Sequence, residues 1–165
     1  MVGFDNTTLF NEPNPFGVCT LSHIESFEKE FSVKLPNDYK EYLCEFNGSK
    51  PINTICSLGA GGETSIHHMY GLHNCNEYKV KIKAGMLIFA DDNFGNKFSI
   101  NLNGGKNYGC IYFVDTEEGG LTLISENFNS FILSLIPKDV YMDHLKNEDP
   151  EVYARILAFK QKPQI

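Results

Sequence analysis

Helical and strand-like patterns occupy separate stretches of this 165-residue chain instead of alternating along it. Apolar side chains recur at helical spacing in residues 22–48 and again after residue 125, whereas residues 64–124 read as strands and turns. A doubly wound parallel sheet needs a helix between successive strands, so this order excludes that architecture. The order predicts an α+β fold, in which two helices, five strands of an antiparallel or mixed sheet and two further helices follow one another.

One hairpin defines the predicted sheet best. Lys97–Leu102 alternates between polar and apolar residues, residues 103–107 form a glycine-rich turn, and Gly109–Asp115 is the returning strand. A strand, a glycine turn and a second strand are typical of an antiparallel pair with one buried face. The remaining strands are predicted at residues 66–70, 86–90 and 121–124.

The first two helices have recognisable boundaries. Ser22 and Glu25 fit a capping box at the start of the first helix. Pro36 suits the first position of the second helix, because its missing N–H has no helical partner there. Asn47 and Gly48 suit its end, where glycine adopts the left-handed conformation that other residues resist.

The C-terminal helices are bounded in the same way. Ser125 is predicted to cap the third helix and Pro137 to end it, and Asp149 precedes an extra C-terminal helix over about residues 150–160. The length favours a single domain over residues 1–165. Within it, residues 1–19 are predicted to be an irregular lead-in.

The charge balance restricts the possible partners. The chain has 14 basic and 21 acidic side chains, which gives a net charge of −7. A protein that binds nucleic acid by itself is normally basic, because it must neutralise phosphates, so no nucleic-acid partner is expected. An acidic chain indicates a basic protein partner or simply solubility.

Targeting signals and cysteine usage indicate a cytoplasmic protein. The first ten residues lack the basic start and apolar run of a secretory signal. No segment approaches the roughly 20 apolar residues of a membrane span, so no membrane association is expected. The five cysteines are scattered without a C-x-x-C pair, which is typical of buried thiols in a reducing compartment.

The densest group of metal-ligating residue types is His67, His68, His73 and Cys75. Imidazole and thiolate groups suit zinc. Adjacent residues of a strand point to opposite faces, however, so His67 and His68 are not expected to share an ion. The favoured interpretation is that these are ordinary strand and turn side chains, and no metal or cofactor is expected.

The sequence contains no recognisable catalytic motif. There is no G-x-S-x-G, and no cysteine lies in a known nucleophile context. Residues 59–64 are rich in glycine but lack the lysine of a phosphate-binding loop, so they read as a flexible connection. The chain is therefore not expected to be an enzyme.

Acidic residues gather beside the predicted strands, at Asp91 and Asp92 and again at Asp115, Glu117 and Glu118. Three interpretations remain open: solvated turns, a carboxylate pair for acid–base or metal chemistry, and an acidic edge that binds a partner. Residues 91–96 resemble a calcium-binding loop only superficially, because the required ligand spacing is not met.

A series of short motifs runs along most of the chain. The first motif lies within Ile24–Pro51 and consists of Leu35, Pro36, Tyr39, Leu43, Asn47 and Gly48. The later ones cover predicted strands and a closing helix, at Met69–Leu72, Leu87–Asp92 with Gly95, Lys97–Leu102, Gly109–Asp115 and Asn127–Ile136. In this order the motifs resemble the SUKH superfamily, in its Smi/Knr-like subgroup. The resemblance covers about residues 21–137 and implies a SUKH-like core in that range.

The resemblance implies a binding protein that catalyses no reaction. Many bacterial members of the superfamily are immunity proteins that neutralise a cognate polymorphic toxin, often a nuclease, in the cytoplasm of the producing cell. The alternatives are a regulatory or scaffold protein with a non-toxin partner and, less favoured, a metal-binding protein or enzyme. The oligomeric state does not follow from the sequence.

A nuclease toxin must be basic to hold phosphate, and an acidic inhibitor is attracted to it. Tight inhibition also needs aromatic or apolar anchors at the centre of the interface. The partner-binding hypothesis therefore combines the two acidic turns with neighbouring amide and aromatic side chains. It comprises Asp91, Asp92, Asn93, Phe94, Asn96, Tyr108, Tyr112, Asp115, Glu117 and Glu118.

Overall fold

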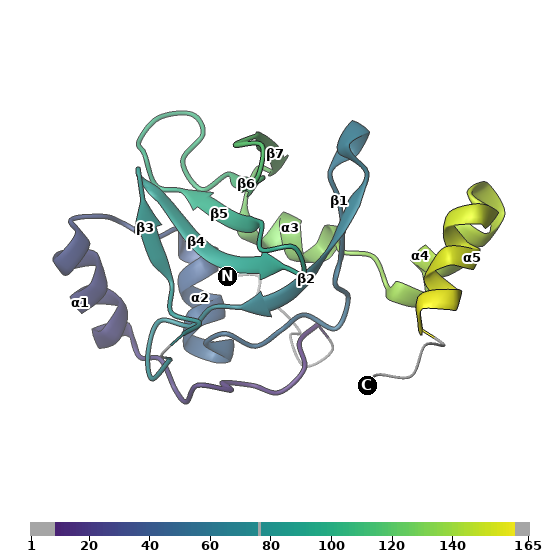
Figure 1. The fold of residues 1–165 in the computed structure, drawn as a ribbon. Helices are drawn as coiled ribbons and strands as arrows, with labels where there is room; N and C mark the ends of the chain where they lie inside the picture. The colour runs from purple at the N-terminus through teal and green to yellow at the C-terminus, as the bar shows by residue number, and fades with distance from the viewer. Residues whose placement is uncertain (1–8, 76, 161–165) are drawn as a thin grey trace.

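The computed structural model describes residues 9–75 and 77–160 and has the predicted α+β architecture (Figure 1). Two helices precede a mostly antiparallel seven-stranded sheet, and three helices follow it. The helices α2 and α3 lie behind the sheet, α1 lies beside β3, and α4 and α5 project away from the sheet at the right of Figure 1. The predicted fold class is thus confirmed.

The sheet has the strand order β1-β2-β4-β5-β6-β7, with β3 paired to β4 beside β2. All pairings between its named strands are antiparallel, and one isolated bridge outside them, between Gly71 and Lys79, is parallel. The strands are β1 (Ile55–Ser57), β2 (Glu63–Met69), β3 (Lys81–Lys83), β4 (Met86–Asp92), β5 (Lys97–Asn101), β6 (Ile111–Val114) and β7 (Leu121–Ser125). The predicted hairpin is β5–β6, which pairs Phe98 with Phe113.

The predicted count of five strands and two final helices is wrong. Strands β1 and β3 have three residues each, too few for alternation to identify them. Helix α4 (Lys138–Glu148) was also missed, because it buries no residue and so has no apolar stripe. The observed order is two helices, seven strands and three helices, with a short 3-10 helix at Gly59–Gly61.

The caps of two helices differ from the predictions. Helix α1 (Leu21–Phe31) is capped by Thr20, whose hydroxyl accepts the His23 N–H while the His23 ring accepts the Thr20 N–H, so the predicted cap at Ser22 is wrong. Helix α3 (Phe128–Ser134) is capped by Asn127 rather than by Ser125. In both cases a nearby residue whose side chain can also cap a helix has the extended backbone that an N-cap requires.

Helix α2 (Asn37–Phe46) begins one residue later than predicted, because Pro36 is its N-cap and not its first helical residue. It ends at Phe46 with Asn47 as its C-cap, and Gly48 follows with φ of 93°. Space also requires a glycine here, because a Cβ on Gly48 would lie 2.4 Å from the Phe16 ring.

The core lies between the sheet and the helices α2 and α3. Tyr39 on α2 meets Phe128 on α3 with ring centroids 5.0 Å apart, and Phe128 meets Phe89 on β4 at 5.5 Å. Phe131 continues the cluster to Phe98 on β5. All five side chains are almost completely buried, so α2, α3 and the middle of the sheet form one hydrophobic unit.

The described part of the lead-in is irregular but contributes to the core. Phe10 is 5% exposed and stacks on Phe46 with ring centroids 4.4 Å apart, and it bridges to Pro51. Residues 1–8 of the predicted lead-in lie outside the described residues.

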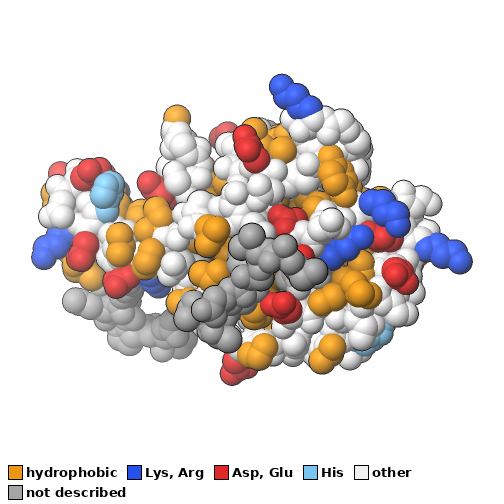
Figure 2. Space-filling model, turned by 180° about the vertical axis from the view of Figure 1, so that it is seen from behind, with side chains coloured by type: hydrophobic (Ala, Val, Ile, Leu, Met, Phe, Trp, Pro, Cys, Tyr) orange, Lys and Arg blue, Asp and Glu red, His pale blue; other side chains and the backbone are white. Residues whose placement is uncertain are grey.

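Helices α4 and α5 (Pro150–Lys160) pack on each other as a hairpin beside the sheet. Asp149 caps α5 by accepting the Val152 N–H, as its position before Pro150 predicts. In the view from behind, the surface of this hairpin carries basic and acidic side chains with apolar ones between them (Figure 2). No helix among the described residues is long and apolar enough to cross a membrane.

Candidate partner-binding surface

The two acidic turns lie at the same end of the sheet, because β4, β5, β6 and β7 follow one another as antiparallel neighbours. The turn between β4 and β5 contains Phe94, and the turn between β6 and β7 contains Glu117 and Glu118. Asn96 joins them: its Oδ1 accepts the Thr116 N–H at 3.1 Å and the Thr116 hydroxyl at 3.3 Å. Residues that are 20 positions apart thus form one continuous surface.

Asp92 builds the first turn and is only 3% exposed. Its Oδ1 accepts the N–H groups of Phe94 and Asn96 at 2.8 and 2.9 Å. Its Oδ2 accepts the Thr64 hydroxyl and the Asn96 side-chain amide. This fixed turn holds Phe94 at its tip, where 84% of the residue is exposed, and Asn93 beside it is exposed as well.

Asp91 is also turned inward, and its side chain is 13% exposed. Its Oδ1 lies 2.9 Å from His68 Nδ1, and its Oδ2 accepts the Tyr70 hydroxyl at 2.7 Å and lies 3.4 Å from the Lys97 ammonium. Burial alone would raise the pKa of Asp91, but the hydrogen bonds from Tyr70 and His68 and the charge of Lys97 outweigh it and lower that pKa.

The second turn presents its carboxylates outward. Asp115 is half-buried, and its Oδ1 accepts the N–H groups of Glu117 and Glu118, both at 2.9 Å. Glu117 and Glu118 themselves are exposed. Of the five carboxylates in the partner-binding hypothesis, these two are exposed. The other three accept hydrogen bonds that hold the turns and strands in place.

The two candidate tyrosines lie apart. Tyr112 is half-buried on β6, opposite Leu123 of β7, on the strand that leads into the turn of Glu117 and Glu118. Tyr108 lies in the loop between β5 and β6, at the other end of these strands, where its hydroxyl donates to the Lys34 carbonyl at 3.0 Å. The structure therefore does not bring Tyr108 together with Phe94.

Sequence reasoning missed two exposed leucines on β7. Leu121 is 58% exposed and Leu123 is 54% exposed, which is unusual for large apolar side chains of a strand. They pair with Val114 and Tyr112 of β6, so apolar side chains continue from the acidic turns along the last strand. The Leu-x-Leu spacing was the available signal, but residues 121–124 were predicted only as a further strand.

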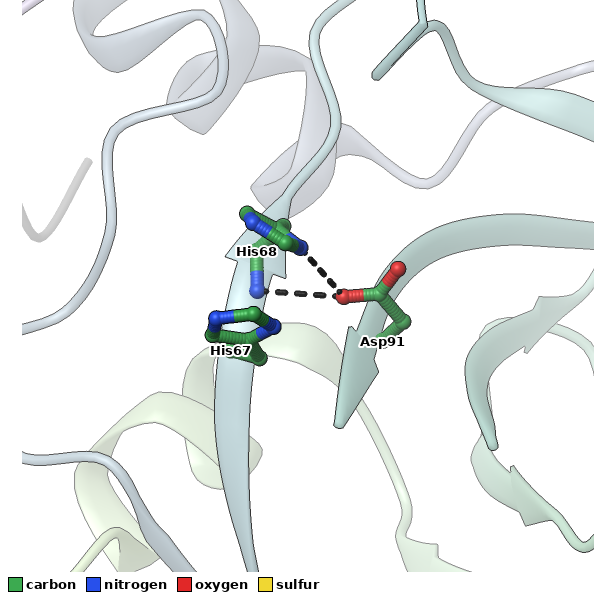
Figure 3. A group of neighbouring side chains, drawn as sticks. All are labelled: His67, His68 and Asp91. Atoms are coloured by element: carbon green, nitrogen blue, oxygen red, sulfur yellow. Dashed lines mark hydrogen bonds and ion pairs between the residues drawn. The ribbon is translucent and has the colours of Figure 1, made fainter. Parts of the chain in front are cut away.

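His67 and His68 lie together, contrary to the prediction that they point apart (Figure 3). The register of β2 shifts between Ile66 and His68, and this bulge leaves the two imidazole rings with centroids 3.8 Å apart. Their ligand atoms and one of Asp91 lie within 4.8 Å of one another. His73 instead stacks on His23, and the Cys75 thiol donates to the Gly71 carbonyl, so these two residues do not join His67 and His68 in one cluster.

This cluster fits a metal ion poorly. Asp91 already accepts four hydrogen bonds, and the Lys97 ammonium beside it repels a cation. His68 is held between Asp91 at Nδ1 and the Tyr78 hydroxyl, 3.1 Å from Nε2. The arrangement is a hydrogen-bond network that joins β2 to β4 and β5, and His67 remains exposed at its edge.

The five cysteines are free thiols, and four of them are buried. Burial raises the pKa of Cys19 and of Cys56 to about 12, and it also raises the pKa values of Cys44 and Cys75. A thiol with a raised pKa is a poor nucleophile because little thiolate exists at neutral pH.

A comparison with protein families identifies this arrangement of elements. The SUKH_6 family model, described as SMI1-KNR4 cell-wall, matches residues 21–132. The chain belongs to the SUKH family. The match runs from α1 into α3, so it covers the sheet and both acidic turns of the SUKH protein but not α4 and α5.

The SUKH motif residues are chiefly structural. Leu35, Tyr39 and Leu43 are each no more than 2% exposed and anchor α2 in the core. Asn47 is fully buried: its side chain accepts the Leu72 N–H at 2.9 Å and donates to the Gly17 and His73 carbonyls. Gly95 has φ of 86° in the Phe94 turn.

One curated relative of this SUKH protein is the SPbeta prophage-derived uncharacterized protein YokK of Bacillus subtilis (strain 168). It is 22% identical over 169 residues, which span 84% of this chain and 85% of the relative. No solved structure matches the chain.

Proposed function

We propose that this chain is an immunity protein that binds and neutralises a cognate toxin in the cytoplasm of the cell that makes both. SUKH proteins are commonly immunity proteins. The proposed action is binding alone, without catalysis. Its proposed contact surface is the acidic surface, by which we mean Asn93, Phe94, Glu117 and Glu118, with Tyr112 at its border.

The observation that carries this proposal is the combination of an exposed aromatic ring with exposed carboxylates on a rigid support. Phe94 is 84% exposed although its backbone is fixed by Asp92. An anchor held in place before binding loses little conformational entropy on association. Glu117 and Glu118 beside it supply the negative potential that attracts a basic partner.

The partner proposed for this surface is a basic toxin domain, such as a nuclease. A nuclease active site is positively charged because it holds phosphate groups. Carboxylates that approach it imitate the charge of the substrate, and Phe94 would fill an apolar depression next to it. The proposal therefore predicts that binding occludes the active site of the toxin.

The absence of catalysis is supported by the state of the reactive groups. Burial raises the pKa values of Cys19, Cys44, Cys56 and Cys75, and Asp91 and Asp92 are tied into the fold by hydrogen bonds. These groups stabilise the scaffold instead of presenting themselves to a substrate.

The test is co-expression of this chain with the toxin domain encoded by the adjacent gene. Wild-type protein is expected to restore growth, and Phe94→Ala combined with Glu117→Lys and Glu118→Lys is expected to abolish the rescue. Matched controls are Val18→Ala, an apolar residue that is 63% exposed, and Glu30→Lys on α1 at the far end of the sheet. Death of cells that contain soluble, folded wild-type protein would contradict the proposal. Absence of any toxin gene nearby would favour the regulatory alternative.

A further inference from the structure

Strand β7 is an exposed edge of the sheet. It ends the strand order, and within the described residues it pairs with β6 alone. Leu121 and Leu123 are more than half exposed on this strand, and Thr122 between them is exposed too. A sheet edge of this kind offers a row of backbone groups to another chain.

The hairpin register identifies which backbone groups face outward. Asp115 donates to the Gly120 carbonyl at 2.9 Å, and Thr122 lies opposite Phe113. Backbone groups of an antiparallel strand alternate between its two neighbours, so Gly120 and Thr122 face β6. The N–H and C=O groups of Leu121 and Leu123 therefore point away from β6, toward the free edge.

The other sheet edges are protected in ways that β7 is not. Strand β3 carries exposed Lys81 and Lys83, and charged side chains of this kind discourage pairing with another strand. Strand β1 is covered at Ile55, which exchanges two backbone hydrogen bonds with Ile136. By contrast, β7 reads Leu-Thr-Leu-Ile-Ser, without a charged residue or a proline.

We infer that β7 is a docking edge, to which an extended segment of a basic protein partner adds as a further antiparallel strand. This inference deepens the proposed function and rests on it, because it specifies how the toxin is held next to the acidic surface. The backbone groups of Leu121 and Leu123 would bind the segment, and its alternate apolar side chains would extend the strip formed by Tyr112, Val114 and the two leucines.

Charge favours a basic partner over a second copy of this chain. Residues 107–137 contain no lysine or arginine, but they contain Asp115, Glu117, Glu118 and Glu126. Antiparallel pairing of two β7 strands about a two-fold axis would bring the acidic turn of one copy toward Glu126 of the other. Such like-charge contacts oppose self-pairing, whereas lysine or arginine at both ends of a partner segment would relieve them.

Leu123→Pro is the sharpest variant, because proline removes the outward N–H and leaves the bonds between Thr122 and β6 in place. Leu123→Ala is the matched control, since it removes most of the side chain and keeps the N–H. The probe is a catalytically inactive form of the toxin domain encoded by the adjacent gene, titrated by calorimetry. We expect Leu123→Pro to bind roughly tenfold or more weakly than Leu123→Ala.

Amide hydrogen exchange of the unmodified protein supplies a measurement that does not depend on a variant's folding. The Leu121 and Leu123 amides are expected to exchange rapidly in the free chain and slowly in the complex. If the wild-type chain binds the toxin domain but these amides stay unprotected, or if folded Leu123→Pro binds as tightly as Leu123→Ala, the docking-edge inference is overturned and the proposed function stands.

Two further outcomes separate the alternatives. Self-association of the free wild-type chain that Leu123→Pro abolishes, seen by analytical ultracentrifugation, would identify a second copy as the occupant of β7 and overturn the inference. If the wild-type chain neither binds nor neutralises the toxin domain, the proposed function fails for that partner, and the docking edge fails with it.

Discussion

The side chain of Asn96 accepts two hydrogen bonds from Thr116, one from its N–H and one from its hydroxyl, and so ties together the two turns of the acidic surface. These two residues lie in different hairpins, and among the described residues no other hydrogen bond links the two turns directly. The Asn96 side chain therefore fixes the Phe94 turn against the Glu117 turn, in addition to the pairing of β5 with β6.

Replacing Asn96 with alanine is expected to lower the free energy of unfolding by about 1 kcal/mol, because the buried Asp92 carboxylate loses a hydrogen bond from the Asn96 amide, whereas the exposed Thr116 donors can turn to water. The affinity for the toxin domain should fall as well, since the anchor and the carboxylates would no longer be held together. Asn93→Ala, in the same turn and exposed, is the control for stability. Chemical denaturation and calorimetric titration measure the two effects, and equal stability of both variants would contradict the argument.

Glycine is required at Gly48 for two reasons but at Gly95 for only one. Both have positive φ, of 93° and 86°, yet a Cβ on Gly48 would meet the Phe16 ring while a Cβ on Gly95 would meet nothing within 4 Å. Gly95→Ala should cost about 1 kcal/mol from backbone strain alone. Gly48→Ala should cost about 2–4 kcal/mol, because overpacking adds to the strain. Urea denaturation curves of the two variants compare these costs, and a smaller loss for Gly48→Ala would refute the packing argument.

The sequence allowed prediction of those features that depend on nearby residues. Alternation identified β5 and β6, and Asn47-Gly48 identified the end of α2, because both signals lie within a few positions. The acidic turns were also located correctly along the chain. What could not be predicted was that Asp91 turns inward, since its partners are Tyr70, directly after β2, and Lys97 on β5.

The β-bulge in β2 is a second feature that could not be predicted from the sequence. The prediction that His67 and His68 point apart assumed a regular strand, and one register shift between Ile66 and His68 overturns it. Helix α4 is a third such feature, because a helix that buries no side chain has no apolar periodicity in its sequence. The exposure of Leu121 and Leu123 likewise depends on β7 being the last strand, which is a property of the whole sheet.

Asp91 is expected to be essential to the network that joins β2, β4 and β5. In Asp91→Asn, the new amide N–H₂ would face the Lys97 ammonium and the Tyr70 hydroxyl, so one donor would oppose another. The free energy of unfolding should fall by about 1–3 kcal/mol. Glu117→Gln, an exposed change of the same chemistry, should leave stability unchanged. Thermal denaturation of both variants tests whether the Asp91 carboxylate stabilises this network, and equal melting temperatures of the two would contradict it.

Zinc is not expected to stabilise the protein through His67 and His68. Binding would require Asp91 or His68 to give up hydrogen bonds that hold β2 to β4, and it would place a cation near Lys97. The melting temperature should therefore be the same in EDTA and in equimolar Zn²⁺. A rise with Zn²⁺ that His67→Ala abolishes would instead establish a metal site at this cluster.

The stability of the protein should decrease in acid through Glu28, whose carboxylate is 3% exposed and holds α1 to the start of α2. Burial opposes its ionisation, but the Leu35 N–H and the ammonium groups of Lys40 and Lys34 outweigh burial and lower the pKa of Glu28 from 4.5 to about 2. A lowered folded-state pKa contributes stability that is complete above the unfolded value, here 4.5, and is lost as the pH falls toward about 2. The loss should reach at most about 3 kcal/mol. Glu28→Gln should be less stable at pH 7 and should show a smaller decline between pH 5 and 2, measured as urea midpoints. Parallel declines of wild type and variant would show that other carboxylates govern the acid response.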